Sequence, residues 1–171
     1  PFSPDAREAE KSAYRCMEQL RLAEYIGARC CVNISGACGS VWDGGYRENY
    51  SERTWVRIVE FVHNLVDTVR PVRTRYTLEP MPWMVPDSPE QYRKLIGDVG
   101  REGFAAHLDV VNMINCPARY FENAAFVDEC FRLLGSHVRC CHLKDTRLDT
   151  RLTVCLEEAP CGEGGMDLAH Y

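Results

Sequence analysis

The feature of this sequence that most limits its fold is a regular alternation of helix-type and strand-type segments. Helical spacing of apolar residues marks residues 5–26, 51–69, 89–101 and 118–135. Strand-type apolar segments fall between them, at residues 29–35, 72–80, 104–112 and 138–144. Because no hairpin signal joins two neighbouring strand segments, the pattern predicts parallel strands connected by crossover helices in an α/β fold.

One later segment breaks this alternation. LTVCLE, residues 152–157, is strand-like, yet only residues 145–151 separate it from the strand segment at 138–144. A parallel crossover needs about 10–12 residues or more, so an antiparallel arm or an ordered part of a loop is expected here. The last residues, PCGEGGMDLAHY, are expected to form a turn that leads into a helix.

The charge balance of the chain is acidic. The 171 residues carry a net charge of −5, and 20 lysines and arginines are scattered among 25 acidic residues. Nucleic-acid-binding proteins usually concentrate basic residues in a stripe or patch, so nucleic acid is not expected as a partner. No segment approaches the ~18 consecutive apolar residues that cross a membrane, and the opening PFSPDAREAEK has no signal-peptide core. We therefore expect a soluble cytoplasmic protein without a membrane partner.

Polar side chains stand where three consecutive predicted strands end. Glu79 ends one strand segment, Asp109 lies near the end of the next, and His142 lies near the end of the third. The carboxyl ends of parallel strands meet at one edge of a sheet, so these three side chains are predicted to converge. A single glutamate or histidine at a strand end is usually a surface or structural group. Three such residues at successive strand ends favour a divalent-metal site.

The donor set of this predicted site limits the metal. Two carboxylates and one imidazole suit Mn²⁺, Mg²⁺ or Co²⁺ and tolerate Zn²⁺. The metal is therefore expected to be hard or borderline in character.

Four short motifs resemble one known family. They are LEPMPWM at 78–84, HLDVVNM at 107–113, CHLKD at 141–145 and EAPCGEGGMDL at 158–168. In this order and spacing they resemble the sugar phosphate isomerase/epimerase family, whose fold is the xylose-isomerase-like TIM barrel. Ketose 3-epimerases, inosose dehydratases and endonuclease IV share that superfamily, which is also called AP endonuclease family 2. The motifs point to the superfamily and leave the substrate open.

The resemblance implies a (β/α)8 TIM barrel that is incomplete in this chain. Residues 1–171 correspond to a partial barrel domain of about four βα units, in which 29–35 is the fourth barrel strand. A whole barrel usually needs about 250 residues, so the first three strands and the last strand are expected to be missing. An open partial barrel exposes two strand edges and much of its inner surface.

The resemblance also implies roles for the three predicted ligands. Family members hold the metal with a Glu, an Asp, a His and a second Glu, and Glu79, Asp109 and His142 match the first three. The strand that carries the fourth ligand is not reached before Tyr171. Three nearby acids lie in the arm and the turn and are not assigned this role: Glu157, Glu158 and Glu163.

The implied activity is that of a divalent-metal-dependent isomerase or epimerase acting on a keto sugar or polyol. Glu79 would remove the proton next to the carbonyl, and the metal would stabilise the resulting enediolate. Because the second carboxylate is absent, this segment alone is expected to be inactive. The implied partner is a small carbohydrate substrate. Whether the protein forms a homo-oligomer is left open by the resemblance.

Five further residues are candidates to bind the substrate: Trp83, His107, Asn112, Lys144 and Arg147. His107 would share a strand face with Asp109, two residues away. Asn112 stands where ketose epimerases of the family often have a substrate-binding histidine, which makes a ketose 3-epimerase a less secure assignment.

Three alternatives remain at this point. An inosose-type dehydratase would use similar ligands and lose water after the same proton abstraction. A phosphodiesterase like endonuclease IV needs a histidine-rich zinc cluster and a grip on DNA, and an acidic chain with five histidines argues against it. The third alternative is a non-catalytic barrel remnant.

Overall fold

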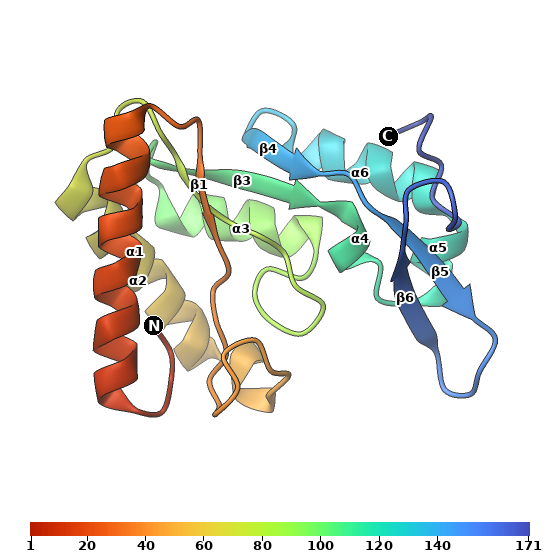
Figure 1. Cartoon of the computed structure of the whole chain (residues 1–171), viewed down its shortest axis with the longest axis horizontal. Helices are drawn as coiled ribbons and strands as arrows, with labels where there is room; N and C mark the ends of the chain where they lie inside the picture. Colours follow the sequence, from red (N-terminus) through yellow and green to blue (C-terminus); the bar gives the residue numbers. More distant parts are fainter.

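The computed structural model describes residues 1–171 and shows the alternation expected from the sequence (Figure 1). The helices are α1 (Ala6–Ile26), the short 3-10 helix η1 (Arg47–Tyr50), α2 (Glu52–Val69), α3 (Pro89–Val99), α4 (Val110–Met113), α5 (Pro117–Phe121) and α6 (Asn123–Leu134). The strands are β1 (Cys31–Asn33), β2 (Tyr76–Leu78), β3 (Phe104–Asp109), β4 (Val138–His142), β5 (Asp145–Asp149) and β6 (Cys155–Ala159).

The first four strands form one parallel sheet in the order β1-β2-β3-β4. Each neighbouring pair is joined through helical segments, and α1, α2, α3 and α6 contact one another in the same order as the strands. This arrangement is a half-barrel with an outer helical layer, so the predicted partial TIM barrel is confirmed. None of the helices combines the length and the apolar character that a membrane span requires.

Local sequence signals set the ends of the main helices. The side chains of Asp5, Ser51 and Ser88 accept hydrogen bonds from backbone amides in the first turns of α1, α2 and α3. These residues satisfy amides that have no partner inside the helix. Gly27 ends α1 with a φ of 73°, a left-handed conformation that costs glycine little.

The core lies between the helices and the outer face of the sheet. Leu20, Leu65 and Leu95 from three successive helices are completely buried. They belong to a single apolar cluster with outward-facing strand residues, among them Tyr76, Leu78, Phe104, Ala106 and Leu108. Burying a side chain of this size stabilises the fold by roughly 2 kcal/mol.

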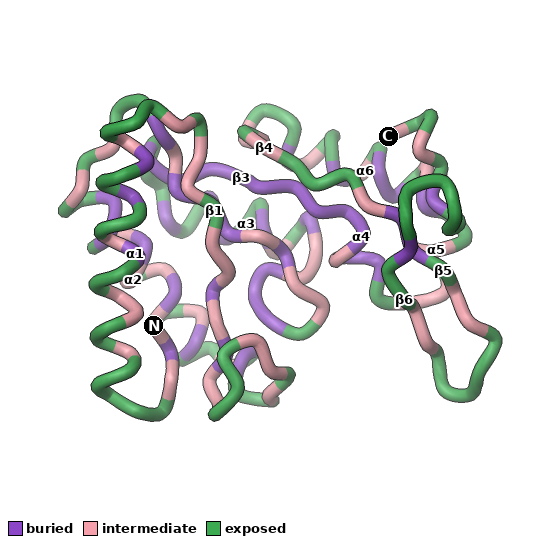
Figure 2. The backbone as a smooth tube through the Cα atoms, viewed as in Figure 1, coloured by how far each residue is buried: buried purple, intermediate pink, exposed green.

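The two edge strands are much more exposed than the central ones. All residues of β2 and β3 are buried, whereas Val32 of β1 is 39% exposed and Cys141 and Leu143 at the end of β4 are exposed (Figure 2). The apolar strand segments 29–35 and 138–144 are therefore only partly buried at these edges. The reason is that neither strand has a neighbour on its outer side, as expected for an open barrel.

The Tyr92 hydroxyl of α3 links β2 to β3 at the point where the two strands separate. This fully buried hydroxyl accepts hydrogen bonds from the amides of Leu78 and His107, both at 3.1 Å. It can donate to the carbonyl of Leu78 at 2.5 Å or of Ala105 at 3.2 Å. A helix side chain thus satisfies backbone groups that the sheet leaves unpaired.

The predicted arm is confirmed as an antiparallel hairpin of β5 and β6. The sequence predicts only a connector at residues 145–149, but these residues form β5, the first strand of the hairpin. Strand β6 runs from residue 155 to 159 instead of 152 to 157. The hairpin projects from the end of the sheet beyond β4 (Figure 1).

Asp145 explains why the CHLKD and GEGG motifs occur together. Its buried carboxylate accepts hydrogen bonds from the amides of Thr146, Gly162, Gly164 and Met166, at 2.8 to 3.0 Å. A Cβ atom on Gly164 would lie 2.1 Å from Asp145 Oδ1, so this close approach requires glycine. The turn expected after residue 159 is confirmed, and no helix follows it before Tyr171.

Replacing Tyr92 with Phe is expected to destabilise the protein by about 1–3 kcal/mol, because buried backbone groups of β2 and β3 lose their partner. The free energy of unfolding from urea denaturation measures this loss. Tyr25→Phe is the control, since Tyr25 is 83% exposed. Equal stability of the Tyr92→Phe variant and the wild type would show that the hydroxyl does not link the strands energetically.

Asp145→Asn is expected to lower stability near neutral pH by about 2 kcal/mol. Burial alone would raise the pKa of Asp145, but the four backbone amides outweigh it and hold the pKa below its ordinary value. The stabilisation is therefore fully present above the unfolded-state pKa of about 3.9 and is lost as pH falls through the folded-state pKa. Urea denaturation between pH 7 and pH 3 should show the wild type approaching the variant at acid pH. Asp43→Asn is the control and should leave the wild-type pH dependence intact, because the half-buried side chain of Asp43 forms no hydrogen bond or ion pair.

Candidate metal centre

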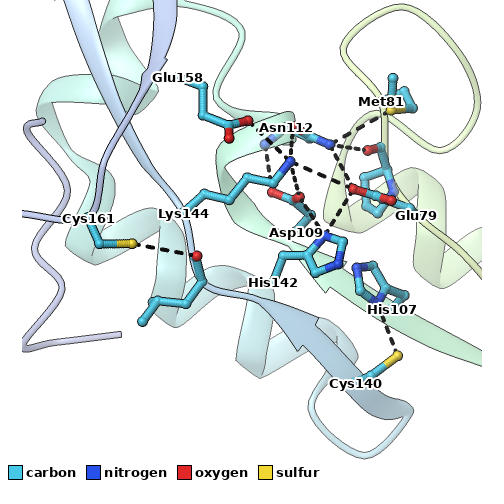
Figure 3. Close-up of polar contacts among 12 residues, drawn as sticks. Glu79, Met81, His107, Asp109, Asn112, Cys140, His142, Lys144, Glu158 and Cys161 are labelled. Carbon is cyan, nitrogen blue, oxygen red and sulfur yellow. Dashed lines mark hydrogen bonds and ion pairs between the residues drawn. The ribbon is translucent and has the colours of Figure 1, made fainter. Parts of the chain in front are cut away.

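The register of three strands brings Glu79, Asp109 and His142 to one point, as predicted. Leu78 pairs with Ala106, and Asp109 pairs with His142, so the three carboxyl ends lie at the same edge of the sheet. His142 Nδ1 lies 3.1 Å from Glu79 Oε1 and 3.3 Å from Asp109 Oδ2 (Figure 3).

The two carboxylate oxygens of Asp109 have different partners. It is fully buried, and its Oδ1 atom accepts a hydrogen bond at 3.0 Å from the amide of Asn112, which caps the short helix α4. The cap orients the carboxylate, and the second oxygen, Oδ2, faces His142 and Lys144. The change from strand to helix directly after Asp109 therefore fixes the direction of this side chain.

His107, a predicted substrate-binding residue, lies with the predicted metal ligands. Ligand atoms of Glu79, His107 and His142 all lie within 4.8 Å of one another. The rings of His107 and His142 meet edge to face, with centroids 4.3 Å apart. His107 shares the inner face of β3 with Asp109 and is only 1% exposed.

One nitrogen of His107 has no partner inside the protein. Nδ1 lies 3.0 Å from Cys140 Sγ, while the buried Nε2 makes no hydrogen bond. Burial, assisted by His142, lowers the pKa of His107 to about 4, so the ring is neutral near pH 7. In the tautomer that donates from Nδ1 to the sulfur, Nε2 offers a lone pair beside Glu79 and His142.

Lys144 places a positive charge among the acidic groups. Its Nζ atom lies 3.0 Å from Asp109 Oδ2, 3.8 Å from Glu79 Oε1 and 3.4 Å from Glu158 Oε2 (Figure 3). Burial alone would lower the pKa of Lys144, but Asp109 and Glu158 outweigh it and raise the pKa. The carboxylates therefore stabilise the positive charge of Lys144.

Glu79 is held as a partly buried carboxylate with a shifted pKa. Burial raises the pKa of Glu79, and the negative charge of Asp109 adds to this effect, while His142 and Lys144 oppose it. Asn112 supports the carboxylate by donating from Nδ2 to Glu79 Oε1 at 3.3 Å and to the Pro80 carbonyl at 3.0 Å.

The remaining candidates divide into two groups. Trp83 and Asn112 line a hollow of about 380 Å³ beside the site, whose other walls include Leu156 and Glu158 of the hairpin. Arg147 does not line it; this exposed side chain of β5 pairs with Glu157 at 3.9 Å.

Sequence reasoning missed the contribution of the hairpin and of Cys140. Glu158 reaches Lys144 only because β6 folds back along β5. The contact between Cys140 and His107 follows from the register of β3 and β4. Alternation along the strand, with Cys140 and His142 on the same face, was the one signal that could have pointed to it.

These residues fit a divalent cation. The buried Nε2 of His107 lacks a partner, and two further ligand atoms lie within 4.8 Å of each other and of His107. The ammonium of Lys144 beside three carboxylates shows that the local field favours positive charge. Carboxylate oxygens and imidazole nitrogens together are typical ligands of Mn²⁺, Co²⁺ and Zn²⁺.

Comparison with known proteins extends this picture. The L-ribulose 3-epimerase structure superposes with a TM-score of 0.71 at 16% identity, covering 99% of this chain and 51% of that one. A xylose isomerase-like TIM barrel protein from Mycobacterium smegmatis, in complex with magnesium, gives a TM-score of 0.69 at 16% identity, covering 95% and 55%. The IOLI protein with a zinc atom gives 0.63 at 16% identity, covering 97% and 56%.

At these identities the likeness concerns the fold, and the chain spans about half the length of each of the three structures. None of the curated proteins matches the sequence. The sequence model of one family, the Xylose isomerase-like TIM barrel, matches residues 1–171 in full. The chain therefore belongs to the Xylose isomerase-like TIM barrel family.

Proposed function

We propose that this half-barrel carries the proton-transfer centre of a divalent-metal-dependent isomerase or epimerase of keto sugars or polyols. The observation that carries the proposal is the convergence of Glu79, His107 and His142 beside the buried carboxylate of Asp109. Similarity in fold to an L-ribulose 3-epimerase supports a carbohydrate substrate.

Glu79, Asp109 and His142 would hold the metal, with Nε2 of His107 as a further donor. A ligand set of two carboxylates and two imidazoles favours Mn²⁺, Co²⁺ and Zn²⁺ over Mg²⁺. When bound, the metal would act as a Lewis acid that polarises the carbonyl of the substrate and stabilises negative charge on its oxygen.

Glu79 would act as the base. Burial raises the pKa of Glu79 above the ordinary value of a glutamate, which makes its carboxylate a stronger base. Glu79 takes the proton from the carbon next to the carbonyl, and the electron pair of the broken C–H bond moves toward the carbonyl oxygen to give an enediolate. Return of the proton to the neighbouring carbon isomerises the sugar, whereas epimerisation needs a second acid on the opposite face.

The other side chains would bind and orient the substrate. Lys144 stays protonated and places positive charge near the developing enediolate oxygens. Trp83 and Asn112 line the adjoining hollow, where an aromatic face and an amide suit the C–H groups and hydroxyls of a carbohydrate. Arg147 is left out of this assignment because it pairs with Glu157 on the hairpin.

Isothermal titration with Mn²⁺ tests the metal site in the chain as it is. We expect a dissociation constant below about 1 mM, and Glu79→Gln or His107→Gln should weaken binding at least about tenfold. Glu163→Gln is the control, because Glu163 lies exposed in the turn after the hairpin. Equal affinity in the wild type and the Glu79→Gln variant would contradict the assignment.

Proton exchange tests the chemistry without requiring net epimerisation. Incubated with Mn²⁺ and a ketose in D₂O, the wild type is expected to introduce deuterium next to the carbonyl, because exchange at one carbon needs only one base. Glu79→Gln should reduce the rate at least about a hundredfold, and mass spectrometry measures the incorporation. An unsaturated product would indicate the dehydratase alternative, and exchange that survives in Glu79→Gln would refute the role of Glu79.

A further inference from the structure

Six arginines gather at the amino ends of the strands, the edge of the sheet opposite the metal centre. They are spread through the sequence as Arg29, Arg73, Arg75, Arg93, Arg101 and Arg139. In the structure they line two hollows of about 260 and 530 Å³, and both Arg75 and Arg139 line each of them. The fold therefore concentrates basic residues that look scattered in the sequence.

Carboxylates neutralise only two of these arginines. Arg101 forms a two-pronged ion pair with Asp67, at 2.8 and 3.0 Å, and Arg73 lies 3.7 Å from Glu24. The other four form no ion pair. A single carboxylate, that of Glu102, lines the larger hollow, and none lines the smaller one.

Two of the four unpaired guanidinium groups are held in place by backbone carbonyls, which leave their charge uncompensated. Arg75 Nη1 donates to two backbone carbonyls at 2.9 Å, and Arg139 Nη1 donates to two others at 3.0 and 3.1 Å. Each guanidinium keeps further N–H groups for a ligand. His137 lines the larger hollow together with Arg75 and Arg139. Burial lowers the pKa of His137, and the positive charges of Arg93 and Arg139 lower it further.

We propose that this arginine cluster binds a compact polyphosphate anion with at least two linked phosphate groups. Four unpaired guanidinium charges exceed the charge of about −2 on a single phosphate, and the planar fork of arginine matches phosphate oxygens in pairs. Ile96 and Phe104 add an apolar floor to the larger hollow. A long nucleic acid is disfavoured, because the charge lies in two hollows rather than along a stripe and the whole chain carries −5.

Titration with tripolyphosphate, ATP and orthophosphate, without added metal, tests the proposal. We expect tripolyphosphate to bind more tightly than orthophosphate, and the double variant Arg93→Gln with Arg139→Gln to bind it about tenfold more weakly. Equal binding of ATP and tripolyphosphate would identify the phosphate chain as the ligand, and tighter binding of ATP would identify a nucleotide. Both results support a polyphosphate site.

The matched control replaces Arg21 and Arg132 with Gln. It changes the net charge equally, but both arginines pair with a glutamate on their own helix. Thermal unfolding checks that each variant folds, and Arg93→Gln alone serves if the double variant does not. Equal weakening in the control, unchanged affinity in the cluster variant, or tighter binding of a short DNA duplex would overturn the proposal. Mn²⁺ titration of the same variants keeps this outcome separate from that of the metal centre.

Discussion

The separation of β2 from β3 is the constraint on which the rest of the site depends. After Leu78 the two strands part, and the Glu79 amide turns to the carbonyl of Asn33 on β1. The Tyr92 hydroxyl occupies the gap and satisfies the freed amides of Leu78 and His107. Without such a partner, each of these buried backbone groups would cost the fold a free energy comparable to that of a lost hydrogen bond. Glu79 and His107, the two residues beside this junction, face the candidate metal centre.

This geometry brings two carboxylates, those of Glu79 and Asp109, close together at the strand ends. They contact His142 and the ammonium group of Lys144, which the hairpin residue Glu158 also contacts. The same arrangement that makes Glu79 a weaker acid keeps Lys144 charged. The site thus combines a carboxylate able to accept a proton with a local field that attracts cations.

The two ends of the sheet have opposite character. Acidic ligands gather at the carboxyl ends of the strands, whereas unpaired arginines gather at the amino ends. Loops at the two ends belong to different parts of the sequence, so each end can carry its own chemistry on one packed core. A binding function at the amino end would therefore not disturb the candidate metal centre at the carboxyl ends.

Local signals in the sequence determined the helix ends, the alternation of elements and the parallel sheet, because caps, glycines and apolar periodicity act over a few residues. They also placed Glu79, Asp109 and His142 at strand ends that had to meet. Only the tertiary structure decided that His107 joins them, that Glu158 arrives from the hairpin and that Arg75, Arg93 and Arg139 form one cluster. Those contacts depend on register, on strand edges and on packing between distant segments, and no short stretch of sequence encodes these relations.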